Sequence, residues 1–172
     1  MKYILTILVS FAIMMTPVAE TNAQKVTDYE TAVGLRLGWG FTLSGKHFIN
    51  DAHAVEGILS YQWGWTFYNR TRIGAVYQVH YPLEDLIDGL SWYWGVGGLV
   101  AFESFSSLNI STQTYFGIIG NIGLDYSVEG MPLNISLDIM PNWLFGSRSD
   151  GFGTRRGFRG DLGGLAVRYI LQ

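Results

Sequence analysis

The sequence predicts an all-β fold: a single antiparallel up-and-down transmembrane β-barrel of about eight strands. Two observations lead to this prediction. From Ala32 to Thr42, large apolar residues alternate with small or charged ones, and the second face is mostly glycine together with Arg36. The chain is also 48% hydrophobic with 22 glycines, yet no later segment has the pattern of a membrane-spanning helix. Such a chain can cross a bilayer only as a closed barrel.

The N-terminus has the pattern of a cleaved signal peptide over residues 1–23. Lys2 precedes an apolar run from Tyr3 to Met15, and small residues follow, so we place cleavage after Ala23. The run of about 13 residues is too short to span a bilayer, and the alternative is a buried N-terminal helix. The chain has no cysteine, which excludes a lipoprotein anchor, a disulfide framework and a thiolate metal site.

The first four strands are expected at residues 31–38, 41–49, 53–65 and 71–81. In each of them bulky residues alternate with small or polar ones. A fold-back near Trp39 and Gly40 separates the first two strands, and a tight polar turn at 50–52 separates the next two. Residues 67–70 are expected as a loop, and Pro82 ends the fourth strand.

The last four strands are expected at residues 90–102, 115–127, 133–140 and 160–171. The seventh alternates most clearly, with Leu133 and Ile135 on one face and Asn134 and Ser136 on the other. Turns are expected at 84–89 and 129–132, and loops at 104–113 and 142–158. Segments of about 8–13 residues match the length of a tilted membrane-crossing strand.

An even number of strands places both termini on the periplasmic side. The aromatic residues then fall into two girdles, as membrane interfaces select. The outer girdle comprises Trp63, Trp65 and Phe67, and the inner one comprises Tyr81, Trp92, Trp94, Tyr126 and Tyr169. The alternative, that these residues form the core of a soluble β-sandwich, is disfavoured because the opposite faces are so rich in glycine.

With its signal peptide, its strand at 132–138 and its closing segment at 163–171, the chain resembles the small eight-stranded outer-membrane barrels of Gram-negative bacteria, of the OmpA-transmembrane and opacity-protein type. The resemblance implies that residues 24–172 form an outer-membrane β-barrel domain in the cell outer membrane. It also implies a monomer whose partners are outer-membrane lipid, lipopolysaccharide and the barrel-assembly machinery, with no nucleic acid. The chain departs from the family at Gln172, where an aromatic residue is usual.

The lumen of such a barrel has room for side chains and little else. The inward-facing charges are predicted to be Arg36, Lys46, Glu56, Arg72, Asp125, Asp138 and Arg168. Because an isolated buried charge is costly, these must pair. We expect an ionic plug, with Asp138 beside Arg168 and Arg168 near Arg36, composed of Arg36, Glu56, Asp125, Asp138 and Arg168. The alternative is a gated ion path.

The function expected is that of a non-enzymatic outer-membrane barrel with a plugged lumen and a structural or surface-binding role through its extracellular loops. A first alternative is a narrow conduit for small apolar molecules that opens sideways, which predicts an apolar inner pocket and a break in the strand ladder. A lipid A-modifying acyl hydrolase is disfavoured, because the three histidines fall near the periplasmic end and no G-x-S-x-G motif occurs. A secreted lipocalin-like carrier is a further alternative.

The last outer loop carries four arginines that could bind lipopolysaccharide phosphates: Arg148, Arg155, Arg156 and Arg159. The alternative is an ordinary solvated loop. No catalytic residue, metal site or cofactor is expected, since no two histidines have the spacing of metal ligands on one face.

Overall fold

A computed structural model describes residues 29–63, 68–83, 85–105, 110–145 and 157–171. The predicted signal peptide lies outside these residues. Ten β-strands are present: β1 Thr31–Gly38, β2 Phe41–Phe48, β3 His53–Trp63, β4 Tyr68–Pro82, β5 Leu90–Phe105, β6 Ile110–Ser127, β7 Leu133–Ile139, β8 Asn142–Phe145, β9 Gly157–Arg159 and β10 Gly164–Leu171.

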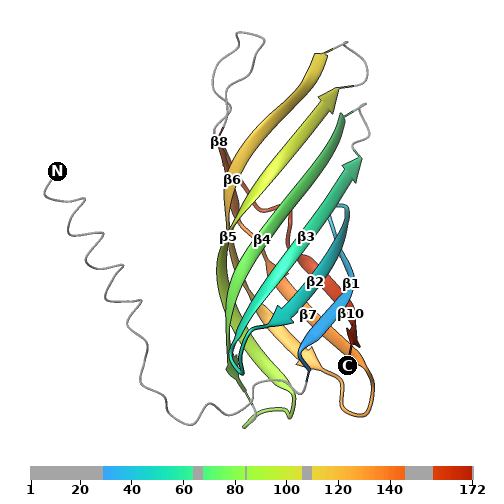
Figure 1. Ribbon diagram of the computed structural model, residues 1–172, viewed down its shortest axis with the longest axis vertical. Coiled ribbons are helices and arrows are strands. Elements are labelled where there is room, and N and C mark those ends of the chain that lie inside the picture. Colours follow the sequence, from blue (N-terminus) through green and yellow to red (C-terminus); the bar gives the residue numbers. More distant parts are fainter. Residues whose placement is uncertain (1–28, 64–67, 84, 106–109, 146–156, 172) are drawn as a thin grey trace, which may run out of the picture.

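The strands form a closed barrel (Figure 1). Strands β1 to β7 pair in chain order, β7 pairs with β10, and β10 pairs with β1, always antiparallel. Strand β8 continues β7 along β6, and β9 pairs with β8 above β10. The ten segments therefore build an eight-stranded barrel, and the predicted fold class is confirmed.

The register sets the width of the barrel. Residues paired with Leu37 can be followed from strand to strand around the barrel. Through β2 to β5 they lead to Thr114 on β6, and through β10 and β7 they lead to Leu124 on β6, so the closed sheet is staggered by ten residues. For eight strands this stagger gives a strand tilt of about 40° and a backbone radius of about 8 Å. A cylinder of this radius has room for side chains and little else.

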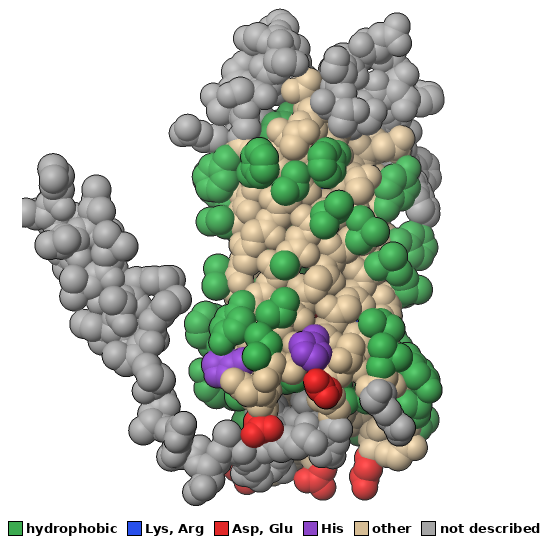
Figure 2. Space-filling model, viewed as in Figure 1, with side chains coloured by type: hydrophobic (Ala, Val, Ile, Leu, Met, Phe, Trp, Pro, Cys, Tyr) green, Lys and Arg blue, Asp and Glu red, His purple; other side chains and the backbone are tan. Residues whose placement is uncertain are grey.

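The barrel is apolar outside and charged inside. Leu35, Ile73 and Leu137 are 47%, 52% and 60% exposed, whereas Arg36, Arg72 and Arg168 are no more than 1% exposed. Figure 2 shows apolar side chains along one wall, with acidic side chains at its lower end. The structure contains, over the residues it describes, no helix of the length and apolarity that crossing a membrane requires.

The wall is much lower on one side than on the other (Figure 1). Strands β1 and β2 have 8 residues each, whereas β5 and β6 have 16 and 18. At about 3.3 Å per residue and a tilt of about 40°, the β1–β2 wall is about 20 Å high and the β5–β6 wall about 40 Å or more. The expected fold-back is present, and the Gly38 amide donates to the Gly40 carbonyl at 3.4 Å.

Two predicted loops, at residues 67–70 and 104–113, prove wrong in part. Strand β4 already begins at Tyr68, β5 continues to Phe105 and β6 begins at Ile110, so the outer strands extend beyond the expected apolar segments. Their polar residues fit a strand because they face inward and pair there, as Arg70 does with Glu103 at 2.7 Å. The described part of the third strand ends at Trp63, and its predicted end at residue 65 lies outside the described residues.

The seventh and eighth strands of the barrel are each interrupted, as β7 and β8 and as β9 and β10. The prediction instead has a loop after the seventh strand and a continuous eighth strand. Residues 142–145 form β8 instead of a loop, and β10 begins at Gly164 instead of residue 160. Between β7 and β8 lies Pro141, which has no amide hydrogen to donate to the ladder. Opposite it, residues 160–163 leave the strand, and Leu162 turns into the lumen at 3% exposure.

Candidate functional site: a layered lumen and a hollow in the wall

Six charged residues from six strands form the lower polar layer of the lumen: Arg36, Lys46, Glu56, Asp125, Asp138 and Arg168. Its centre is Glu56, whose Oε1 accepts from Arg36 Nη2 at 2.8 Å and from Arg168 Nη2 at 2.7 Å. Arg36 Nη2 also reaches Asp138 Oδ2 at 2.6 Å. Three positive and three negative side chains thus balance inside the barrel.

The structure brings together the five residues of the expected plug, but with a different pairing. Arg168 bonds Glu56, and its predicted partner Asp138 bonds Arg36 and Tyr93 instead. The prediction also left Lys46 out of the plug, although its Nζ lies 2.7 Å from Asp125 Oδ1. The inward position of Lys46 is visible in the sequence. Its partner is not, because Asp125 lies across the lumen rather than on a neighbouring strand.

An apolar layer lies above the lower polar layer, and the sequence analysis did not find it. Nine buried side chains pack together inside the barrel: Ile58, Val76, Leu99, Ala101, Tyr115, Ile119, Met140, Leu144 and Leu162. Because apolar residues stand on both faces of β5 and β6 here, the alternation weakens at Leu99 and Ile119. That loss of alternation is the sequence signal for this layer.

A second polar layer lies in the outer half of the lumen, centred on Asp161. The Asp161 carboxylate accepts hydrogen bonds from Arg72 Nη1 at 2.8 Å and from Arg70 Nη1 at 3.0 Å. Gln62 Nε2 donates to the backbone carbonyl oxygen of Asp161 at 3.0 Å. Asp161 belongs to the segment 160–163, which is thereby tied to β3 and β4. The prediction had assigned Arg70 to a loop, and it named Asp161 neither as an inward charge nor as a member of the plug.

Of the four arginines proposed to bind lipopolysaccharide, only Arg159 is among the described residues. Its Nη2 lies 3.7 Å from Glu103 Oε1, and its side chain is 21% exposed. It therefore adjoins the second polar layer. Residues 148, 155 and 156 lie outside the described part.

The three histidines lie in the lower half, as predicted. His80 is inside, with Nε2 3.3 Å from Lys46 Nζ. His47 and His53 are on the outer wall, where His47 Nδ1 is 2.9 Å from Thr31 Oγ1 and His53 Nδ1 is 2.5 Å from the Tyr77 hydroxyl. Among the described residues, no group of three histidine, cysteine, aspartate or glutamate side chains could hold a metal ion.

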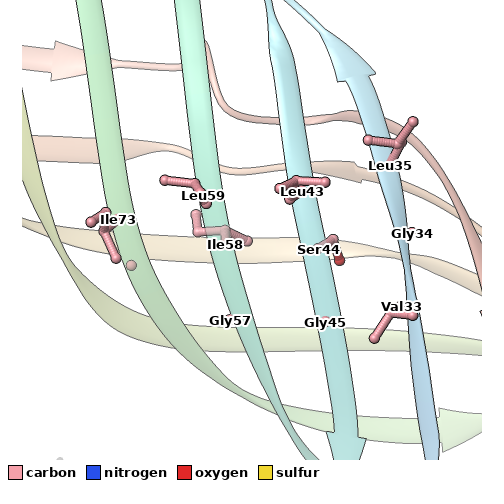
Figure 3. A pocket seen from close by; sticks show the side chains of 11 residues that line it. Val33, Gly34, Leu35, Leu43, Ser44, Gly45, Gly57, Ile58, Leu59 and Ile73 are labelled. Atoms are coloured by element: carbon pink, nitrogen blue, oxygen red, sulfur yellow. The ribbon is translucent and has the colours of Figure 1, made fainter.

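A hollow of about 720 Å³ lies on the outside of the barrel, over β1 to β4 (Figure 3). Gly45 and Gly57, which pair directly across β2 and β3, form its floor. Apolar side chains surround them: Val33, Leu35, Leu43, Leu59 and Ile73. The hollow faces away from the lumen, toward the region that lipid occupies around a membrane barrel.

A closed eight-stranded antiparallel barrel, apolar outside and charged inside, is the fold of the small outer-membrane barrels. Among solved structures, the crystal structure of Neisserial surface protein A is similar to this chain, with a TM-score of 0.50 and 19% identity over 82% of this chain and 93% of that one. No protein-family model matches the sequence, and no curated protein matches it. The likeness confirms the fold expected from the family resemblance.

Proposed function

We propose that the protein is a non-enzymatic barrel of the cell outer membrane with a closed lumen, and that it acts structurally or as a surface-binding protein through its extracellular ends. The observation that supports a closed lumen is its three-layer filling. Two networks of paired charges enclose the apolar layer of nine side chains. No conformational change is needed to keep ions out of such a lumen.

The apolar layer is the main barrier. An ion that passes Ile119 and Leu99 must lose its hydration shell among side chains that offer no charge in return. Transfer of a bare ion into such surroundings costs far more than thermal energy. The lower layer adds a second barrier, because Glu56 is already paired with both Arg36 and Arg168.

Conductance of the refolded protein in a planar bilayer tests this proposal. The expected result is no stable open level with the wild-type chain. The matched comparison replaces Leu99 and Ile119 by serine, which removes apolar bulk from the barrier and should raise conductance. A large, stable wild-type conductance would overturn the closed lumen.

A hydrolase is not supported by the outward-facing histidines. Their contacts are with Thr31 and Tyr77, and neither ring contacts a serine in the described part of the wall. They also lie near the chain termini, at the periplasmic end, whereas lipid A is in the outer leaflet. Unchanged lipid A masses on expression of the protein would agree with this view, and loss of an acyl chain would refute it.

A lateral conduit for small apolar molecules is the second candidate, and one observation favours it. The ladder between β7–β8 and β9–β10 is interrupted beside the apolar layer, as such a conduit requires. The interruption is closed in this structure, since a Cβ placed on Gly163 would lie 2.5 Å from the Asp138 carbonyl oxygen. Entry of an apolar dye into vesicles, faster with the Asp161→Asn barrel than with wild type, would support the conduit over the closed barrel.

A further inference from the structure

We infer that the hollow over β1 to β4 binds one phospholipid of the periplasmic leaflet, with an acyl chain on Gly45 and Gly57, the phosphate at His47 and His53, and an ammonium headgroup near Asp51. The inference rests on the proposed membrane location and orientation. Without this site, the outer wall would contact lipid but would not select one kind of lipid over another.

The hollow is an open, almost entirely apolar depression of about 720 Å³ in the wall. A ligand lying on it would contact the wall on one side and the surrounding lipid on the other. The floor is backbone. Val33 on β1 and Ile73 on β4 lie to either side of it, and the paired residues Leu43 and Leu59 stand beyond one end, as Figure 3 shows. A hydrocarbon chain can therefore contact main-chain atoms that side chains cover elsewhere on the wall.

The barrel itself does not require glycine in the floor. A Cβ on Gly45 would have its nearest neighbour, Val33 Cγ1, at 3.8 Å, and a Cβ on Gly57 would have the Gly45 carbonyl oxygen at 4.0 Å. These are ordinary contacts, whereas a Cβ on the inward-facing Gly34 would lie 2.0 Å from a backbone oxygen. Glycine weakens a strand, and inside a strand it often marks the close approach of a ligand.

His47 and His53 lie on the outer wall below the hollow and are not among the residues that line it. His47 is two residues below Gly45 on the same face of β2. His53 on β3 is the diagonal neighbour of His47, and Cα atoms of such neighbours are about 7–8 Å apart. Each ring uses Nδ1 in a contact with the wall, and within the described part of the chain neither Nε2 has a hydrogen-bond partner. In the tautomer that carries its hydrogen on Nε2, each ring can donate a hydrogen bond to the phosphate of a lipid bound on this wall.

The charge below the histidines selects the headgroup. Asp51 is exposed in the β2–β3 turn, two residues before His53 in the chain. Figure 2 shows acidic side chains below histidine on this face of the barrel. A zwitterionic lipid with a primary ammonium group satisfies both, since its phosphate meets the imidazoles and its ammonium meets the carboxylate. A purely anionic headgroup would meet the carboxylate unfavourably.

The test measures phospholipid retained by the full-length barrel. The refolded protein is incubated in detergent with equal amounts of phosphatidylethanolamine and phosphatidylglycerol, and bound lipid is counted by native mass spectrometry. We expect one phosphatidylethanolamine per barrel, at least five-fold preferred over phosphatidylglycerol. The variant Gly45→Leu with Gly57→Leu fills the floor and should retain at least ten-fold less.

Two further variants separate the parts of the site. Gly98→Leu is the matched control, because Gly98 is an outward glycine on β5 whose Cβ would also meet nothing closer than 3.8 Å, and it lies outside the hollow. It should retain lipid as wild type does. His47→Phe with His53→Phe keeps the wall apolar and should abolish the preference between the two headgroups.

Equal retention by wild type and the filled variant, or equal retention of the two lipids by wild type, would overturn the inference. Heat-modifiable gel migration shows that each variant is folded. A barrel that inserts into bilayers without retaining lipid contradicts only this site, whereas a barrel that does not insert contradicts the proposed function.

Discussion

Replacing Glu56 by glutamine tests whether the lower ion network holds the barrel together. Glu56 is fully buried and bridges two buried guanidinium groups, those of Arg36 and Arg168. Glutamine has nearly the same shape but no charge. Among the described residues, the substitution leaves Arg168 with Asp125 as its one ionic partner, at 3.9 Å.

The expected loss follows from the burial of these groups. Removing one partner of a buried ion pair typically costs about 3–5 kcal/mol, because the other charge stays buried without compensation. Arg36 keeps Asp138, and the glutamine oxygen still accepts a hydrogen bond, so we expect the lower end of this range. About 3 kcal/mol corresponds to a shift of about 100-fold in the unfolding equilibrium.

Equilibrium denaturant unfolding in lipid vesicles, followed by tryptophan fluorescence, measures this loss. Glu129→Gln is the matched control, because Glu129 is exposed in the β6–β7 turn, and its change should stay within about 0.5 kcal/mol. Adding Arg168→Met to Glu56→Gln restores the balance of charge and should cost less than the two single changes together. A loss below about 0.5 kcal/mol for Glu56→Gln would refute the reasoning.

Three further predictions concern the interrupted wall and the outer end. Gly163→Ala should destabilise the barrel by about 1–3 kcal/mol in the same unfolding assay, because its Cβ would lie 2.5 Å from the Asp138 oxygen, whereas Gly160→Ala, with nothing within 4 Å, should be neutral. Asp161→Asn weakens charged hydrogen bonds from Arg70 and Arg72 and should cost about 1.5–3 kcal/mol, and an unchanged unfolding midpoint would contradict the role of Asp161 as a tie. Replacing the four arginines Arg148, Arg155, Arg156 and Arg159 by serine should reduce the lipopolysaccharide that co-purifies with the barrel, and an unchanged amount would remove that proposal.

The alternation in the sequence was enough to predict the barrel and the inward direction of the charges. A period of two assigns Arg36, Glu56 and Arg168 to one face, and a closed barrel makes that face the lumen. It does not assign partners across the lumen, since contacts such as Lys46 with Asp125 depend on the stagger of the closed sheet.

The outer half was predicted less well, for a physical reason. Polar residues such as Arg70 and Glu103 look like loop residues along the chain, although their pairing inside the barrel makes a strand favourable. The hollow was equally hard to foresee, because outward Gly45 and inward Gly34 are the same residue type with opposite surroundings. Only the three-dimensional neighbours separate a glycine that the backbone requires from one that leaves space.

The low β1–β2 wall has a consequence for the membrane itself. A wall of about 20 Å is shorter than the apolar band of about 25 Å that outer-membrane barrels usually present. In the proposed outer-membrane location, the bilayer beside β1 and β2 would therefore become thinner by several ångströms, at a cost of a fraction of a kcal/mol per ångström. Trp39, which is 80% exposed at the tip, then marks the deepest point of this depression. Two barrels that turn their low walls toward each other share one depression, so membrane deformation alone gives neighbouring copies a preferred mutual orientation.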